Sequence, residues 1–400
     1  MTKKPTIITA AITAVCVFAL TTAFYLSPTG SIVFGLISDT VTGSSYAKFI
    51  QFENLIEKKY MGSYNGSALM DNALHMYVAS LNDPYSSYFN KNEYEDFSSN
   101  LGGDYRGIGV TVANANGRIL IKNVQKNSPA QKGGIQKGDI LAKVNGKDYS
   151  GNELSAAVMA IKAIPLGSSV VITVERGGKI LDLTVVIEEI KRELVSSRME
   201  QPGIGYIRLQ SFGTDVFEKF KSQIEELKKQ GMKGLIIDLR SNPGGTLTAA
   251  VDVGNYLLPE GNIITIRNKS GGEEVYKSDK NELGLPMCVL INENSASASE
   301  VIAGALRDYK KATLVGKKTF GKGVVQTVFD LGDKTALRLT TAKYYTPSGE
   351  CIHAKGIAPD IEVDLPDGVS FTQNDTEIEN DTQLEAAITE INRLLSDGQA

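Results

Sequence analysis

The second half of the chain alternates between helical and strand-like hydrophobic patterns. One helical face recurs at spacings of three and four residues and consists of Val216, Phe217, Phe220, Ile224 and Leu227. Residues 234–239 then form an almost continuous apolar run, and residues 287–291 form another ahead of a second helical pattern. Runs of this kind are typical of strands buried on both faces of a sheet. The patterns therefore predict an α/β domain over residues 191–365.

Residues 101–190 have a different pattern of hydrophobic positions. Short β-rich runs are separated by glycine-containing turns, and they cover residues 109–112, 119–121 and 170–174. A single helix is expected among them, from Leu154 to Ile161. This part of the chain is predicted to be a small, mostly β domain inserted before the α/β domain.

Helical spacing also marks the residues on either side of these domains. Residues 44–100 are predicted to be helical, with a break at Asp83-Pro84, because the residue before a proline avoids helical geometry. Residues 366–400 read as a polar tail with one last helix, from Gln383 to Leu395. The expected fold class is thus α/β within a multidomain chain.

The N-terminus carries the signature of a membrane-directed segment over residues 1–43. Lys3 and Lys4 precede an uncharged stretch from Thr6 to Leu26, whose 21 residues approach the about 20 needed to cross a bilayer. No further cation occurs until Lys48, which predicts that the start lies inside and the remainder outside the cell. A single-pass anchor and a cleaved signal peptide both fit.

Composition narrows the function classes. The 400 residues carry a net charge of −4, which argues against nucleic-acid partners. The three cysteines, Cys16, Cys288 and Cys351, lack the spacing of a metal site or a disulfide framework, and Cys16 and Cys288 are expected to be buried thiols. No metal and no cofactor is predicted.

Histidine chemistry is not favoured. The chain has two histidines, His75 and His353, and no G-x-S-x-G elbow accompanies either. A different candidate is the segment Asn292-Glu293-Asn294-Ser295-Ala296-Ser297-Ala298-Ser299-Glu300, which follows a buried run and opens a helix. A strand-to-helix junction can direct backbone N–H groups at one point and stabilise an oxyanion. Taken alone, the segment is equally explained as a helix cap completed by a glutamate three residues on.

A lysine between two glycines is the matching candidate base. Lys322 lies in Phe320-Gly321-Lys322-Gly323, and burial would lower its pKa toward neutrality. The alternative to a buried base is that Lys322 is an ordinary surface lysine in a glycine-rich turn. Gln326 follows four residues later and could hold the amine, but about 13 Å separates such positions in an extended strand, so contact requires a bend.

Several motifs in order resemble the C-terminal processing (tail-specific) peptidase family. They span about residues 45–365 and comprise Asp83-Pro84-Tyr85-Ser86, Asp238-Leu239-Arg240-Ser241-Asn242-Pro243-Gly244-Gly245, the Ser-Ala repeat ending at Glu300, Thr319 to Gln326, Leu339 to Gly349, and Lys355 to Asp360. The resemblance implies a crotonase-like protease core with Ser297 as nucleophile, Lys322 as base and Gln326 positioning the lysine. It also implies an oxyanion hole from the Ala298 amide and an amide of Gly244 or Gly245.

The β-rich insert resembles a PDZ domain. The resemblance makes Arg106, Gly107, Ile108, Gly109 and Val110 the loop that receives a substrate C-terminus while the peptide adds as a strand to the sheet edge. One departure is Lys162, where the family usually has an arginine, and it puts regulation through this domain in doubt.

These features predict a membrane-tethered or secreted serine endopeptidase with a Ser-Lys dyad. Its partners would be extracytoplasmic proteins with free C-termini and the membrane, and the helical segment 44–100 is a candidate for pairing two copies into a homodimer. A non-catalytic PDZ scaffold and a Ser-His hydrolase are the alternatives.

Overall fold

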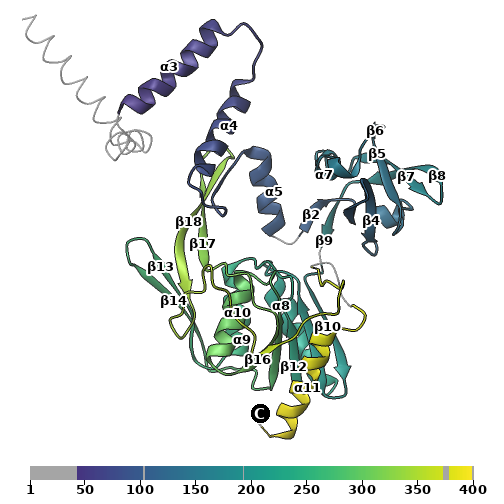
Figure 1. Ribbon diagram of the computed structural model, residues 1–400, viewed down its shortest axis with the longest axis vertical. Coiled ribbons are helices and arrows are strands. Elements are labelled where there is room, and N and C mark those ends of the chain that lie inside the picture. The colour runs from purple at the N-terminus through teal and green to yellow at the C-terminus, as the bar shows by residue number, and fades with distance from the viewer. Residues whose placement is uncertain (1–42, 102–103, 192, 373–377, 399–400) are drawn as a thin grey trace, which may run out of the picture. The chain divides into compact units, whose positions relative to one another are not determined.

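The computed structural model describes residues 43–101, 104–191, 193–372 and 378–398 (Figure 1). The chain forms two compact units, residues 1–73 and 74–400. The first contains α3 (Gly43–Lys59) and most of α4 (Gly66–Ala79). The stretch from Thr6 to Leu26 lies outside the described residues; within the described ranges, no helix combines the length and apolar character needed to span a bilayer.

The start of the second unit differs from the all-helical expectation. After α4, the chain forms the short strand β1 (Ser87–Phe89) and then α5 (Lys91–Leu101). β1 pairs antiparallel with β18 (Ala336–Tyr345), so that Ser87 stands opposite Arg338. Three residues are too short a run for periodicity to identify as a strand.

Residues 107–187 form the predicted small β domain. Its antiparallel sheet has the order β3-β4-β5-β7-β8, with β6 on β5, and two short helices and a 3₁₀ turn complete it. The bounds are β3 (Val110–Ala115), β4 (Arg118–Val124), α6 (Pro129–Lys132), β5 (Ile140–Val144), β6 (Lys147–Asp148), α7 (Leu154–Lys162), β7 (Ser169–Arg176) and β8 (Lys179–Val186). A ribbon of β2 (Asp104–Gly107) and β9 (Glu188–Lys191) leads into and out of it. β3 is therefore an edge strand.

The α/β domain is built on a six-stranded sheet of order β10-β11-β12-β15-β16-β19. All neighbours pair in parallel except β10 and β11, and the apolar runs predicted as buried strands are the central β12 and β15. The strands are β10 (Val195–Gln201), β11 (Ile204–Leu209), β12 (Gly234–Asp238), β15 (Met287–Ile291), β16 (Ala312–Gly316) and β19 (Ile361–Glu362).

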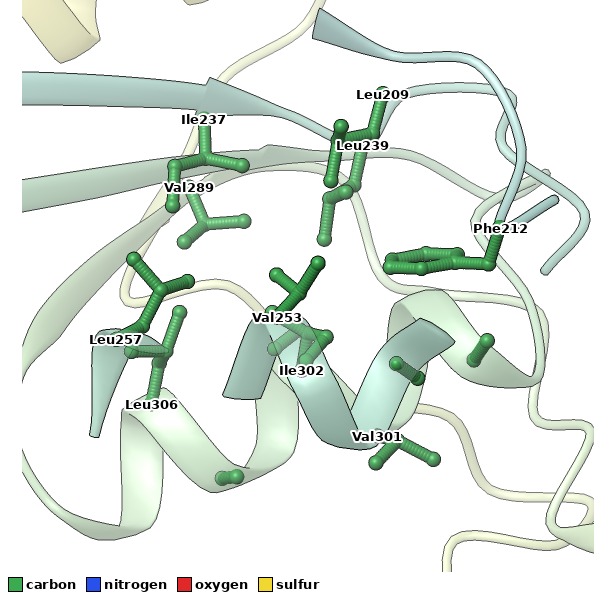
Figure 2. Close-up of a cluster of buried hydrophobic side chains, with 14 of the residues drawn as sticks. Leu209, Phe212, Ile237, Leu239, Val253, Leu257, Val289, Val301, Ile302 and Leu306 are labelled. Atoms are coloured by element: carbon green, nitrogen blue, oxygen red, sulfur yellow. The ribbon is translucent and has the colours of Figure 1, made fainter. Parts of the chain in front are cut away.

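Three helices cover one face of this sheet. They are α8 (Val216–Lys229), α9 (Leu247–Leu257) and α10 (Ala298–Asp308). Figure 2 shows Val253 and Leu257 of α9 and Ile302 and Leu306 of α10 pointing toward the strand residue Val289. The amphipathic face predicted for residues 216–227 is buried in this same core.

The last helix, α11 (Thr382–Ser396), covers the opposite face. Leu384, Ala387 and Ile391 pack against strand side chains that include Ile236 and Cys288. The helix in residues 366–400 is thus part of the core of the α/β domain. Cys288 is fully buried there, as expected, and burial raises the pKa of its thiol to about 12.

A second, antiparallel sheet lies beside the helical layer. Its order is β1-β18-β13-β14, and β17 pairs with β18. The additional strands are β13 (Gly261–Asn268), β14 (Glu273–Ser278) and β17 (Val324–Asp330). This sheet and the N-terminus of α10 together line the cavity described next.

Candidate active site

Ser297 stands at the junction between β15 and α10 in a conformation that is rare for residues with a side chain. Its φ of 57° and ψ of −115° lie outside the regions that L-residues favour. Strained dihedrals of this kind persist where the surrounding structure enforces them, and they cluster at active sites. The Ser297 side chain is half-buried and lines a cavity of about 350 Å³.

The two neighbouring serines are occupied by structural hydrogen bonds. The fully buried Ser295 hydroxyl donates to the carbonyl of Leu239 at 2.7 Å. The buried Ser299 hydroxyl donates to the carbonyl of Asn242 at 2.9 Å. Neither serine lines the cavity. The geometry therefore distinguishes Ser297 from the rest of the repeat.

Lys322 lines the same cavity from the loop before β17. Its Nζ lies 5.0 Å from the centre of the Tyr85 ring, and it forms no salt bridge with a described residue. Burial lowers the pKa of Lys322, and the nearby Arg338 cation lowers it further against the opposing charges of Glu300 and Asp83. An amine in these surroundings loses its proton more readily than an ordinary lysine.

Glu300 connects the two segments that carry Ser297 and Lys322. Its side chain is completely buried. One carboxylate oxygen accepts the backbone N–H groups of Ser297 and Lys322, each at 2.9 Å. The other accepts the Gly321 N–H at 2.7 Å and the Thr319 hydroxyl at 2.6 Å. The capping glutamate seen in the sequence therefore also fixes the lysine loop, a role that only the fold reveals.

A tyrosine from the second sheet braces the same two segments. The Tyr344 hydroxyl of β18 contacts the carbonyl oxygen of Ser297 at 3.1 Å and that of Lys322. Its ring is almost fully buried. Sequence reasoning placed Tyr344 in a motif but gave it no role.

Two backbone amides are free to face the cavity beside Ser297. The amides of Gly245 and Ala298 donate no hydrogen bond to a described residue, and both residues line the cavity. Gly244 lies against Ser297, and a Cβ there would come within 2.8 Å of the Ser297 Cβ, but its amide donates to Asn242 at 2.9 Å. Of the two glycines expected to contribute, the geometry favours Gly245.

Gln326 lines the cavity without a hydrogen bond to Lys322. Its Nε2 donates to the carbonyl of Val324 and to the Thr340 hydroxyl, each at 3.4 Å. The ladder between β17 and β18 shifts register between Val325 and Gln326. The strand is thus irregular, as a contact between Gln326 and Lys322 would require. In this structure, however, the side-chain amide of Gln326 bonds to Val324 and Thr340 instead.

The residues expected to receive a chain terminus line a separate, mostly apolar pocket of about 70 Å³. Arg106, Gly107, Ile108, Gly109 and Val110 form one wall, and the α7 side chains of Leu154, Ala157, Val158 and Ile161, with Lys162, form another. The amides of Ile108 and Gly109 have no described acceptor. A groove between an edge strand and a helix, closed by free amides, can accept an added strand and its carboxylate.

The histidines take part in different contacts. His75 pairs with Glu93 at 2.8 Å, away from the cavity. The His353 ring meets the Tyr85 ring edge-on at 6.3 Å, and its backbone adjoins Gly323. His353 is therefore closer to the lysine than its sequence position suggested, yet it does not line the cavity. Within the described ranges, no cluster of three metal-ligating side chains occurs.

Comparison with family models finds three matches along the chain. Residues 203–363 match peptidase family S41, and residues 107–187 match the PDZ domain. Residues 36–93 match the N-terminal domain of the activating protease CtpB.

Whole-chain relatives agree with these matches. The carboxy-terminal processing protease CtpA of Bacillus subtilis (strain 168) is 36% identical over 359 residues, covering 89% of this chain and 76% of the relative. A carboxy-terminal-processing protease of Bartonella bacilliformis is 37% identical over 337 residues, covering 81% of this chain and 76% of the relative.

Solved structures show the same architecture. The photosystem II D1 C-terminal processing protease superposes with a TM-score of 0.50 at 28% identity, covering 79% of this chain and 86% of its own. A putative S41 protease from Bacteroides fragilis NCTC 9343 shares the fold with a TM-score of 0.55 at 18% identity, covering 83% and 91%.

Proposed function

Because the chain belongs to peptidase family S41, with the carboxy-terminal processing proteases, we propose that it is a serine endopeptidase with Ser297 as nucleophile and Lys322 as general base. The observation that carries this proposal is the cavity itself. A serine in a strained backbone conformation and a half-buried lysine with a lowered pKa line the same cavity, beside two free amides.

The chemistry is acyl transfer in two steps. The Ser297 hydroxyl attacks a peptide carbonyl while the neutral Lys322 amine accepts its proton. The amides of Gly245 and Ala298 stabilise the oxyanion, and protonated Lys322 then gives the proton to the leaving amine. Water, deprotonated by the same lysine, attacks the acyl-enzyme and releases the new C-terminus. Gln326 is proposed to orient the lysine once a substrate changes the packing of β17.

Matched substitutions test this assignment. Ser297→Ala and Lys322→Met should each reduce cleavage of an unfolded protein by about 10³-fold or more, because residues of a catalytic unit act together. Lys318→Met, an exposed lysine of the same loop, and His353→Ala should retain activity.

Equal cleavage by all forms would contradict the dyad. Loss of activity in His353→Ala but not in Lys322→Met would favour a Ser-His hydrolase. Binding of C-terminal peptides without cleavage by any form would favour the non-catalytic scaffold.

The PDZ domain over about residues 101–190 is proposed to select substrates by their free C-termini. The edge strand β3, the free amides of Ile108 and Gly109, and the apolar wall of α7 support this role. We assign the helical segment to residues 44–100, the protease domain to residues 191–365, and residues 366–400 to a C-terminal extension.

The N-terminal residues 1–43 are proposed to direct the catalytic part outside the cell, as an anchor or as a cleaved signal segment. The charge pattern at Lys3 and Lys4 and the uncharged run to Leu26 support this proposal. Fractionation of the expressed chain with N-terminal sequencing separates the cases: an intact, membrane-bound chain indicates an anchor, whereas a shortened, soluble one indicates cleavage. An intact chain in the cytosol would contradict both.

The helical segment is further proposed to pair two copies of the chain. Large apolar side chains are exposed on α3, among them Phe49, Ile50, Phe52 and Leu55. Light scattering should show a dimer that Phe52→Glu converts to a monomer. A monomeric parent chain would contradict this proposal.

A further inference from the structure

Arg338 lies inside the catalytic cavity without an anionic partner. It belongs to β18 and lines the cavity together with Ser297 and Lys322. No acidic side chain of the described residues forms a salt bridge with it, and its Nε atom is buried without a hydrogen-bond acceptor. Arg338 is half-buried, and a guanidinium partly withdrawn from water commonly has a carboxylate or carbonyl partner, since leaving the charge unpaired is costly.

The position of this guanidinium is fixed by aromatic packing. Its Cζ lies 5.2 Å from the centre of the Phe89 ring and 5.6 Å from that of Phe97, and the two rings stack on each other. Cation–π contacts hold an arginine plane without satisfying its N–H groups. Arg338 is therefore held in place while its hydrogen-bond donors stay available.

The acidic group that acts electrostatically on Arg338 already accepts other hydrogen bonds. Asp83 interacts electrostatically with Arg338, but its carboxylate accepts the Tyr85 N–H at 3.1 Å and the Ser86 hydroxyl at 2.6 Å. Burial lowers the pKa of Arg338 in spite of the Asp83 charge, in agreement with incomplete compensation of the cation. No described residue supplies an anionic partner, so the hydrogen-bond donors of Arg338 are open to a group of the substrate.

We propose that Arg338 determines specificity by binding a carboxylate of the substrate close to the scissile peptide bond. A planar guanidinium accommodates a carboxylate through two parallel hydrogen bonds, which a lysine or a neutral residue cannot reproduce. The carboxylate can belong to an aspartate or glutamate side chain, or to the end of a short tail that is being removed. This inference rests on the proposed protease activity at Ser297.

Pairs of peptides that differ at one residue test whether the carboxylate comes from a substrate side chain. Quenched fluorescent peptides, amidated at the C-terminus, would carry Glu or Gln at each position from the third before to the third after the cleavage site. The parent chain should cleave the Glu peptide about ten- to a hundredfold faster, as kcat/KM, at one of these positions. Arg338→Met should reduce this ratio to below about twofold. Taking the ratio cancels any effect of the substitution on Lys322, because both peptides meet the same enzyme.

A second pair of peptides tests whether the carboxylate is the C-terminus of the substrate. Peptides with one to three residues after the cleavage site would end in a free acid or in an amide. A preference for the free acid that is smaller in Arg338→Met than in the parent chain identifies the chain end as the carboxylate. Because the PDZ domain is unchanged in this variant, its own preference for free termini persists in both enzymes.

Arg267→Met is the matched control. Arg267 lies on β13 of the same sheet and stacks on Tyr345 at 4.3 Å, but it pairs with Glu273 at 2.7 Å and does not line the cavity. It should leave both peptide ratios unchanged. Equal loss for Glu and Gln peptides in Arg338→Met would mean that Arg338 only packs against its two phenylalanines, and this would overturn the proposal.

A binding experiment separates this inference from the proposed activity. The Ser297→Ala chain, with and without Arg338→Met, would be titrated with the same Glu and Gln peptides. Tighter binding of the Glu peptide that depends on Arg338 supports the carboxylate site whether or not the parent chain cleaves. Equal affinities, together with equal cleavage, would refute it.

Discussion

The backbone N–H of Lys322 donates to the carboxylate of Glu300 at 2.9 Å. The same carboxylate oxygen accepts the N–H of Ser297, so a single buried group fixes the main chain at both proposed catalytic positions. The proposed nucleophile and base are thus held by the same carboxylate although 25 positions separate them in the sequence.

Glu300→Gln should disturb both segments at once. An amide can offer only one oxygen to the four donors that surround Glu300, and each unsatisfied donor costs about 1–3 kcal/mol. We expect the free energy of unfolding to fall by at least about 2 kcal/mol, and kcat to fall by about 10²-fold. Denaturant titration and steady-state kinetics measure the two effects. Glu293→Gln, an exposed glutamate of the same turn, should change neither.

The pH dependence of cleavage should report the protonation of Lys322. Its pKa is lowered by burial and by Arg338, and only the neutral amine can accept a proton, so the rate should fall as pH decreases through this lowered pKa. Arg338→Met removes a cation, which should raise the pKa and move the acidic limb to higher pH. Glu300→Gln removes an anion, which should move it to lower pH. If the acidic limbs of the pH profiles coincide in the parent chain, Arg338→Met and Glu300→Gln, Lys322 is not the titrating base.

Substitution of Gly244 should inactivate the enzyme without unfolding it. Its φ of 102° disfavours a side chain, and an added Cβ would meet the Ser297 Cβ at 2.8 Å. Gly231→Ala is the matched control, because Gly231 has a similar φ of 91° but open space around it. Gly231→Ala should lose about 1–2 kcal/mol of stability and Gly244→Ala more than this because of the close contact, while only Gly244→Ala should lose activity. Full activity of Gly244→Ala would show that the Ser297 conformation tolerates displacement.

The PDZ groove can be tested from two sides of α7. Val158 lines the apolar pocket, whereas Met159 is 70% exposed on the same helix. Val158→Asp places a charge where an apolar side chain of the peptide would lie, so the Kd for a peptide with a free apolar C-terminus should rise at least about tenfold. Met159→Asp should leave it unchanged in fluorescence anisotropy. Equal weakening by both would place the binding site elsewhere.

Strong periodicity identified the central elements of the fold. The helical face from Val216 to Leu227 and the buried runs at residues 234–239 and 287–291 became α8, β12 and β15. β1 escaped notice because it has three residues. The strands β17 and β18 are half-exposed, so their polar residues do not mark them as clearly as an apolar run does.

The candidate site was visible in part for a similar reason. Ser297 and Lys322 stood in motifs, but Glu300 read as a cap because the loop at residues 319–322 joins it only in three dimensions. Arg338 carried no local signal, since its significance depends on the cavity around it and on the absence of an acidic partner among the described residues. The orientation of Gln326 depends on a register shift that sequence does not encode locally.

β18 also determines how the enzyme should respond to heat. One strand supplies Tyr344, which holds the carbonyl groups of both proposed catalytic residues, and Arg338, which faces the substrate cavity. The six-stranded sheet does not include this strand and is covered on both faces by helices. Most side chains of β18 are only half-buried, and elements with fewer buried apolar contacts open at lower free energy than a sheet covered by helices. Moderate warming should therefore silence catalysis reversibly while the far-UV circular dichroism of the parallel sheet and its helices is still intact.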